Sequence, residues 1–202
     1  MFNIETFKVE EDPYKLAKEM IKAQLGKKAR IIGSGVYGAV WSAKSSDIVY
    51  KIGDAENNDG YLSFIKVLAK QKTHNPFFPK IYGLRYIKRA NPYHSLESTF
   101  VVAMEKLNRL KDRNNAVTSF FNNELVDDEF DDEEFDDEEY DNARKILGVK
   151  QIIPKPLKTA LSVLREAKKL GNSERRFGVV WDLHEGNFMQ RGNQIVITDP
   201  LS

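Results

Sequence analysis

The chain has 202 residues, 41% of them hydrophobic, and a formal net charge of +1, which is enough material for one core of moderate size. It contains no cysteine, which excludes a disulfide framework and a thiolate metal site and favours an intracellular protein. No run approaches the roughly 20 apolar residues that span a bilayer, and the N-terminal stretch lacks a signal-peptide pattern, so we expect a cytoplasmic protein without a membrane partner.

The first predicted element is a helix within an N-terminal segment, residues 1–26. The stretch PYKLAKEMIKAQLG has Pro13 near its start, apolar residues at helical spacing, and Gly26 at its end. Three short runs rich in β-branched and aromatic residues follow, ARII, AVWSAK and DIVYKI, and they predict strands. The glycine-rich turn GSGVYGAVW, residues 33–41, joins the first run to the second. Because a dinucleotide-binding loop leads into a helix and not a strand, this order disfavours a Rossmann fold.

The next stretch, DGYLSFIKVLAKQK, predicts an amphipathic helix, and FFPKIYGLRYIKR and STFVVAMEKL predict two more strands joined by a loop around Pro92. We therefore expect an α+β protein in which residues 27–107 form a lobe with a five-stranded antiparallel sheet. Residues 108–202 would form a second, minimal and helical lobe. Its main helix would be KPLKTALSVLREAKKLG, which ends at Gly171.

An acidic segment lies between these two parts. The sequence DDEFDDEEFDDEEYD, residues 127–141, contains twelve of the 30 acidic residues, which leaves 18 acidic against 31 basic residues elsewhere. Its aromatic residues recur every five positions, a period that gathers them on one side of neither a helix nor a strand. We therefore predict that the insert 122–142 is disordered. As a hypothesis, it engages the basic body or a basic partner protein; unchanged partner binding at every salt concentration after deletion of 127–141 would contradict this.

The end of the chain carries the polar groups with the clearest chemical meaning. The stretch FGVVWDLHEGNFMQRGNQIVITDPLS predicts a short strand, a polar loop, and a hairpin that turns at RGN, residues 191–193. Asp182 and Asn187 lie in the loop, and Asp199 follows the hairpin. If the two strands pair, Asn187 comes close to Asp199. Oxygen ligands of this kind suit Mg²⁺, which one or two carboxylates commonly hold together with substrate phosphates.

The glycine turn, Lys51 in IVYK, Asp182 with Asn187 five positions later, and Asp199 follow the order of the protein-kinase signature motifs. Phosphoryl transfer depends mainly on positioning and charge stabilisation. In this interpretation Lys51 neutralises the nucleotide phosphates, and Asn187 and Asp199 hold the metal. Asp182 orients an acceptor hydroxyl and takes its proton, and Asp182 and Lys51 form the predicted catalytic set. The predicted cofactors are ATP and Mg²⁺.

The predicted nucleotide contacts come from several parts of the chain. Backbone amides of the glycine turn would cover the phosphates, Val40 would pack on the adenine, the MEKL stretch would offer it backbone hydrogen bonds, and Met189 would lie beneath it. The full predicted set is Gly33, Ser34, Gly35, Val36, Tyr37, Gly38, Val40, Lys51, Met104, Glu105, Leu107 and Met189. We leave His184 out of the catalytic set, because one histidine without partner ligands is more often a structural hydrogen-bonder. Self-phosphorylation of Ser34, which would place negative charge against ATP, is a further hypothesis.

At these residues the sequence resembles a known family. WDLHEGNFMQRGNQIVITDPLS is similar to the catalytic loop and magnesium segment of the early serine/threonine protein kinases of T-seven-like bacteriophages, and GSGVYGAV and VYKIG are similar to their glycine loop and lysine strand. The resemblance covers residues 31–51 and 181–202 well and the middle in outline. It implies a two-lobe protein-kinase-like fold. It also implies an ATP-dependent kinase of the host cytoplasm that phosphorylates host transcription, RNA-processing and translation proteins and helps to shut off host gene expression.

The sequence departs from protein kinases at several points. Trp181 stands where most cellular kinases have an arginine, and the chain ends three residues after Asp199, so either the second lobe is minimal or the chain is shortened. Lys51 needs a carboxylate partner, and Glu56 and Asp59 lie only near the start of the neighbouring predicted helix.

Two alternatives remain open. DLHEGN is also similar to the aspartate loop of aminoglycoside and choline phosphotransferases, in which case the acceptor would be a small molecule. The other alternative is a non-catalytic protein with a kinase fold that binds its partner through the acidic segment. Direct binding of nucleic acid is not expected in any of these interpretations.

Overall fold

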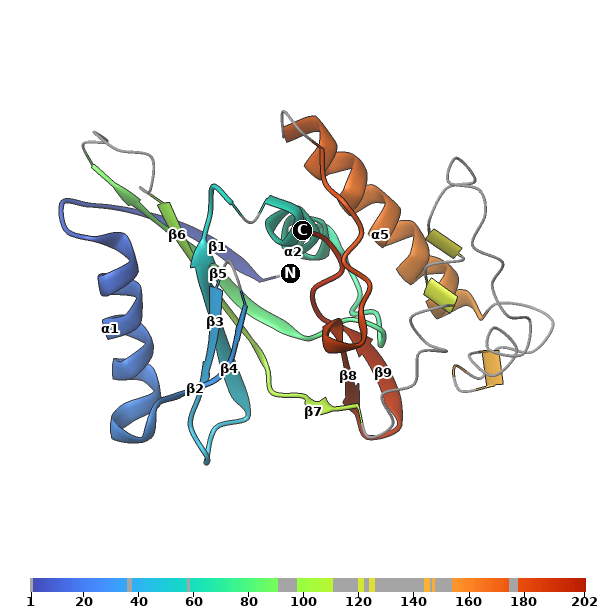
Figure 1. Ribbon diagram of the computed structural model, residues 1–202, viewed down its shortest axis with the longest axis horizontal. Coiled ribbons are helices and arrows are strands. Elements are labelled where there is room, and N and C mark those ends of the chain that lie inside the picture. Colours follow the sequence, from blue (N-terminus) through green and yellow to red (C-terminus); the bar gives the residue numbers. More distant parts are fainter. Residues whose placement is uncertain are drawn as a thin grey trace.

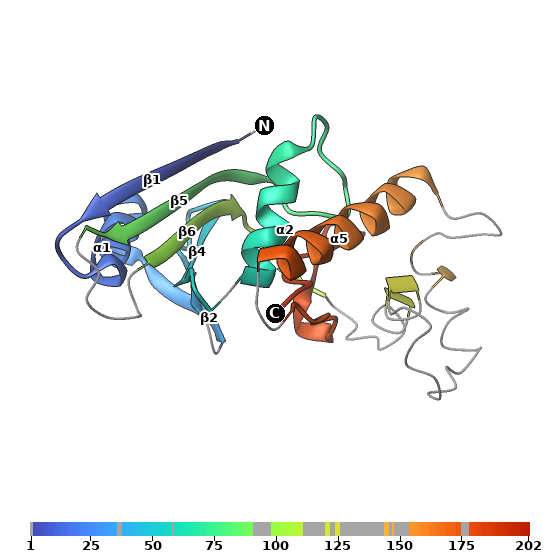
Figure 2. The ribbon, with the colours of Figure 1, turned by 90° about the horizontal axis from the view of Figure 1, so that it is seen from above.

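The computed structural model describes residues 2–35, 38–57, 59–90, 98–110, 120–121, 124–125, 144–145, 147, 154–174 and 178–202. The acidic insert predicted at 122–142 lies outside these residues except for Glu124 and Leu125, as do Val36, Tyr37 and the loop around Pro92. Figure 1 shows a large sheet with helix α1 on one side and helices α2 and α5 on the other, and Figure 2 shows the same layers from above.

Six strands form the large sheet, in the order β1-β5-β6-β4-β3-β2. Their bounds are β1 Asn3–Val9, β2 Arg30–Gly35, β3 Gly38–Ser42, β4 Ile48–Asp54, β5 Ile81–Arg89 and β6 Ser98–Glu105. Strands β2 to β6 are the five predicted strands and pair antiparallel. The predicted total of five is nevertheless wrong, because β1 adds a sixth strand that pairs parallel with β5. Most side chains of this edge strand are exposed, so it lacks the alternation by which strands are recognised in a sequence.

Helix α1, Pro13–Leu25, confirms the predicted N-terminal helix. Asp12 caps its start by accepting hydrogen bonds from two backbone N–H groups of the first turn. Gly26 ends it with a φ of 73°, a region of backbone conformation that favours glycine. Ala17 and Ile21, one turn apart, are buried against the sheet. A short 3₁₀ turn, Gly26–Lys28, connects the helix to β2.

Two helices pack on the opposite side of the sheet. They are α2, Asp59–Lys70, and α5, Lys155–Glu174. The start of α5 agrees with the prediction, but its predicted end at Gly171 is wrong. The helix continues to Glu174. Packing explains the glycine at 171, because a Cβ there would come within 2.6 Å of the Val179 side chain. Buried side chains of α2 and α5 belong to one hydrophobic core together with those of the sheet.

The two faces of the sheet contribute to two separate clusters of buried side chains. Along β6, Phe100 and Val102 belong to the core with α2 and α5, whereas Val101 between them belongs to the cluster with α1. Successive side chains of a strand point to opposite faces. Ile52 in β4 belongs to the α1 cluster, so its neighbour Lys51 faces the C-terminal part of the chain.

A second, small sheet consists of β7 Asn108–Arg109, β8 Phe188–Arg191 and β9 Gln194–Ile197. Strands β8 and β9 form the predicted hairpin, which turns at Gly192 with a φ of 61°. The 3₁₀ turn Glu185–Asn187 precedes it. The short strand predicted before the polar loop is reduced to a single bridge between Trp181 and Leu201.

None of the helices in the described part of the chain is both long enough and apolar enough to cross a membrane.

Candidate functional site

The segment before β8 and the segment after β9 lie side by side. Val180 and Ser202 exchange two backbone hydrogen bonds, of 3.1 and 3.2 Å, and the Asp182 N–H donates to the Pro200 carbonyl at 2.9 Å. These bonds continue the pairing of the hairpin beyond its strands. They place Asp182 on the chain segment that runs next to Asp199. The Asp182 side chain is 37% exposed and the Asp199 side chain 31%.

Asn187 is held firmly between these two segments. Its side-chain nitrogen donates to the Asp182 carbonyl at 2.7 Å. Its backbone carbonyl accepts hydrogen bonds from both the N–H and the hydroxyl of Thr198, each at 2.9 Å. The residue is buried. The bond from the amide nitrogen fixes the orientation of this group, and the side-chain oxygen is the acceptor that Asn187 can offer to a cation.

Lys51 reaches the same place from β4. Its ammonium nitrogen lies 2.5 Å from Oδ2 of Asp199, although the two residues are 148 positions apart in the chain. The Lys51 side chain is mostly buried. Glu56, one of the two partners considered from the sequence, is exposed and lies before α2. The side chain of the other, Asp59, is outside the described part of the structure.

These residues line a cavity of about 570 Å³, a volume typical of small-ligand sites. Of the residues predicted for the site, its wall contains Ser34, Gly35, Gly38, Val40, Lys51, Met104, Glu105, Leu107, Asp182, Asn187, Met189 and Asp199. Gly33 does not line it and lies opposite Val40 in the β2–β3 pair. Val36 and Tyr37 are outside the described residues. The prediction did not include seven further residues of the wall, although all of them lie in the stretches 31–51 and 181–202 that carry the motifs: Ile32, Val49, His184, Gly186, Thr198, Leu201 and Ser202.

The glycines of the turn between β2 and β3 differ in their structural role. A Cβ on Gly38 would collide with the carbonyl oxygen of Ile52 in β4, so the pairing of these strands requires glycine at this position. Gly33 and Gly35 have open space where a Cβ would lie. Packing within the protein therefore explains Gly38 but not the other two.

His184 lies against the candidate base, which the sequence analysis did not anticipate. Its Nδ1 accepts a hydrogen bond of 3.1 Å from the Gly186 N–H, so the proton of the neutral ring is on Nε2. Nε2 is 3.5 Å from Oδ1 of Asp182. A Cβ on Gly186 would lie 2.7 Å from the His184 ring, so glycine at 186 allows this arrangement. The sequence held one signal for this contact: His184 follows Asp182 by two positions in the stretch DLH.

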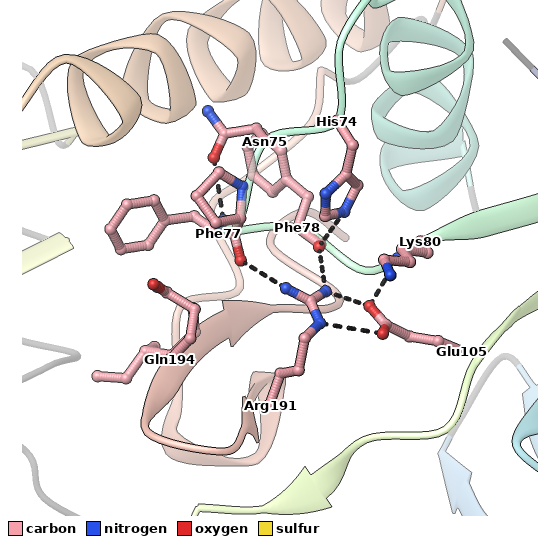
Figure 3. A network of polar contacts seen from close by, with 10 residues as sticks. His74, Asn75, Phe77, Phe78, Lys80, Glu105, Arg191 and Gln194 are labelled. Atoms are coloured by element: carbon pink, nitrogen blue, oxygen red, sulfur yellow. Dashed lines mark hydrogen bonds and ion pairs between the residues drawn. The ribbon is translucent and has the colours of Figure 1, made fainter.

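Figure 3 shows a polar network centred on Arg191, and one of its members, Glu105, lines the cavity. The Arg191 guanidinium makes two hydrogen bonds to the Glu105 carboxylate and donates to the carbonyls of Pro76 and Phe78 at 3.1 and 3.0 Å. The Glu105 carboxylate also accepts the Lys80 N–H at 2.7 Å. The network ties the β8–β9 hairpin to the end of β6, and thereby fixes one wall of the cavity.

The network lowers the pKa of Glu105 below its ordinary value of 4.5. Burial alone would raise that pKa, but the hydrogen bonds from Arg191 and from the Lys80 N–H, together with the Arg191 charge, outweigh it. A carboxyl group with a depressed pKa in the folded state stabilises the protein above its unfolded pKa. This stabilisation is lost as the pH falls through the folded-state value.

We predict that the free energy of unfolding decreases below about pH 4.5 and that Glu105→Gln makes this decrease shallower.

Arg191→Met should destabilise the protein at neutral pH by about 1–3 kcal/mol, because it leaves a largely buried carboxylate without its main donor. Urea unfolding at a series of pH values measures both effects. The matched control is Glu174→Gln, which removes the charge of an exposed glutamate paired with Lys66 and should change little. Equal pH slopes for Glu105→Gln and the wild type would contradict the prediction.

The donor set at Asn187 and Asp199 fits Mg²⁺. Within the described residues no group of three or more histidine, cysteine, aspartate or glutamate side chains could hold a metal, so a complete protein cage is not found there. One carboxylate and one amide oxygen, however, match a cation that keeps most of its coordination for phosphate oxygens and water. We therefore keep Asn187 and Asp199 as the predicted metal ligands.

Comparison with known proteins found no matching family model and no matching curated protein. Solved structures with a similar arrangement include Rad53 bound to AMP-PNP, at 18% identity and a TM-score of 0.40, covering 84% of this chain and 36% of that one. A protein assigned as a fructosamine-3-kinase from Haemophilus somnus 129PT has 14% identity and a TM-score of 0.37, with coverage of 94% and 74%. The streptomycin–ATP complex of APH(2″)-IIa has 13% identity and a TM-score of 0.34, with coverage of 95% and 72%. This chain thus spans about a third of the Rad53 structure.

Proposed function

We propose that the chain is an ATP-dependent phosphotransferase with a two-lobe, protein-kinase-like fold, and that its acceptor is a serine or threonine hydroxyl of another protein. The observation that carries the proposal is the presence of Lys51, Asp182, Asn187 and Asp199 on the wall of one cavity, which the glycine turn also lines. A fixed cation, a carboxylate base and two oxygen ligands beside a cavity of nucleotide size are the groups that phosphoryl transfer needs.

In the proposed reaction, the acceptor hydroxyl attacks the γ-phosphorus of ATP. A new oxygen–phosphorus bond forms, the bond between the γ-phosphorus and the β–γ bridging oxygen breaks, and ADP leaves. Asp182 takes the proton of the hydroxyl, and His184 holds the Asp182 carboxylate in place. Lys51 supplies positive charge to the phosphates that are not transferred. Mg²⁺, held by Asn187 and Asp199, would neutralise the charge on the phosphate oxygens.

The adenine would bind between Val40 and Met189, in the part of the cavity that Glu105 and Leu107 also line. At the end of β6, the Glu105 N–H donates to the Lys80 carbonyl and the Lys106 N–H donates to the Asp47 carbonyl. We therefore assign the N–H of Leu107, the next along the chain, to the edge of the base. This arrangement would leave the γ-phosphate pointing towards Asp182.

The choice of a protein acceptor rests on the resemblance to the phage kinases and on the exposure of Asp182. By the same resemblance, the acceptors would be host transcription, RNA-processing or translation proteins, and the effect would be shutoff of host gene expression. A small-molecule acceptor is the second candidate. It is favoured by the sequence of the DLHEGN loop, which is similar to the aspartate loop of aminoglycoside and choline phosphotransferases.

The deciding experiment incubates the purified protein with Mg²⁺ and γ-³²P-labelled ATP in three parallel reactions: with bacterial lysate proteins, with aminoglycosides and choline, and alone. We expect label on serine and threonine of lysate proteins. Label on a soluble small molecule would transfer the proposal to the second candidate, and no transfer in any reaction would contradict both. The reaction without an acceptor tests self-modification, because Ser34 is exposed at the cavity wall and should then carry the label.

A further inference from the structure

Lys51 has a second neighbour besides Asp199, and this neighbour is aromatic. The Lys51 ammonium nitrogen lies 3.5 Å from the centroid of the Tyr61 ring, well inside the distance at which a cation is attracted to the face of a ring. Asp199 Oδ2 is 2.5 Å from the same nitrogen. The charged end of Lys51 is thus held by a ring from α2 and a carboxylate from the C-terminal segment.

Helix α2 has no carboxylate to offer in its middle. Its sequence, DGYLSFIKVLAK, is acidic only at its first residue. In protein kinases the corresponding lysine is oriented by a glutamate from the neighbouring helix. In this chain, the residue of α2 that contacts Lys51 is Tyr61.

The Tyr61 environment favours the use of its ring face and not of its hydroxyl. The side chain is fully buried, its ring lies 5.7 Å from the ring of Phe100, and its hydroxyl has no hydrogen-bond partner among the described residues. Burial, and after it the charge of Asp199, raises the pKa of Tyr61 well above 10.0. Tyr61 is therefore neutral and cannot serve as an anionic substitute for a glutamate.

Gly60 explains how the ring comes so close to Lys51. A Cβ on Gly60 would lie 2.9 Å from backbone atoms of Leu201 and Ser202, two residues that follow Asp199 closely. The first turn of α2 therefore packs directly on the C-terminal segment. Figure 1 shows the C-terminal end of the chain next to α2. Tyr61 is the next residue along the helix, so the contact at Gly60 sets the position of the ring between the helix and Lys51.

We propose that Tyr61 is the positioning residue of Lys51: its ring face holds the ammonium group in place of a carboxylate from α2. A ring attracts the cation without cancelling its charge. Lys51 would thus keep its full charge for the nucleotide phosphates, and would stay in place when Asp199 turns from Lys51 to the metal. The role in catalysis rests on the function proposed above, whereas the contact between Lys51 and Tyr61 does not.

Two substitutions separate the ring face from the bulk of the side chain. Tyr61→Phe keeps the ring and removes a hydroxyl that has no described partner, so both the Michaelis constant for ATP and kcat should stay close to the wild-type values. Tyr61→Leu keeps an apolar side chain but removes the ring, and the Michaelis constant for ATP should rise about tenfold while kcat changes less. We expect this split because Lys51 would bind the phosphates that are not transferred, so a displaced Lys51 weakens ATP binding more than it slows the transfer step. A purely structural role would instead lower kcat through loss of folded protein.

A spectroscopic measurement tests the contact without any need for activity. In protein with ¹³C-labelled lysine, the ε-methylene signal of Lys51, assigned by its absence in Lys51→Arg, should be shifted upfield by the Tyr61 ring. The shift should persist in Tyr61→Phe and disappear in Tyr61→Leu. Gly60→Ala, which pushes α2 away from Leu201, should reduce it. An unshifted Lys51 signal in the wild type overturns the proposal, even if the leucine variant fails to fold.

The outcomes distinguish this proposal from the function on which it builds. A shifted Lys51 signal in a protein that transfers no phosphate would contradict the proposed function and leave the contact standing. An active enzyme in which Tyr61→Leu has the wild-type Michaelis constant for ATP would contradict the positioning role and leave the phosphotransferase proposal standing.

Discussion

Replacing Asp182 with asparagine should reduce the rate of phosphoryl transfer by about 10²–10⁴-fold, the usual contribution of a positioned general base. The substitution keeps the shape of the side chain. It also leaves intact the backbone bonds that connect Asp182 to Pro200 and Asn187. Nucleotide affinity should therefore change little. Single-turnover transfer from labelled ATP and a separate measurement of nucleotide binding test the two parts.

The matched control for this variant is Asp47→Asn, which makes the same chemical change at an exposed aspartate outside the cavity wall. It should keep full activity. Thermal unfolding of both variants shows whether the fold is intact. If Asp182→Asn transfers phosphate at the wild-type rate, Asp182 is not the base. An unchanged melting temperature of this variant shows that a loss of activity does not come from a loss of folding.

Replacing Asp199 with asparagine should have the second large effect, because this carboxylate meets both Lys51 and the predicted metal. The rate of transfer should fall by roughly 10²-fold or more, as is typical when one group that stabilises transition-state charge is removed. The remaining activity should need a higher Mg²⁺ concentration. Stability should fall by about 1–3 kcal/mol, since Lys51 is mostly buried and loses its counter-charge.

Initial rates measured over a range of Mg²⁺ concentrations test this prediction, with urea unfolding as the test of stability. Glu56→Gln serves as the control, because Glu56 is an exposed acid that does not line the cavity and does not pair with Lys51. Its Mg²⁺ dependence should equal that of the wild type. The same Mg²⁺ dependence in Asp199→Asn would show that Asp199 does not bind the metal.

Local signals in the sequence were sufficient for most of the elements. Pro13 and Gly26 bracket α1, and alternating or β-branched runs locate β2 to β6 and the β8–β9 hairpin. Strand β1 was missed because an exposed edge strand needs no apolar face. A glycine near the end of a helical pattern predicts a stop, but Gly171 lies inside α5. Glycine fits there because Val179 packs against it, a contact that only the folded chain brings about.

In the candidate site, too, the sequence indicates which residues take part but not which of them pair with one another. The order of the motifs was enough to group Lys51, Asp182, Asn187 and Asp199 in one hypothesis, because each lies in a short stretch with its own pattern. The pairing of these groups depends on distant parts of the chain. Lys51 meets Asp199 across 148 positions and Arg191 meets Glu105 across 86, and neither pair leaves a periodic trace in the sequence.

The most direct test of the account is a crystal structure of the protein with Mg²⁺ and a non-hydrolysable ATP analogue. The account predicts the adenine between Val40 and Met189, the triphosphate beside Lys51, and the metal bound by Asn187 and Asp199 with the γ-phosphate facing Asp182. A nucleotide bound elsewhere on an intact fold, with the cavity at Lys51 and Asp199 empty, would contradict it.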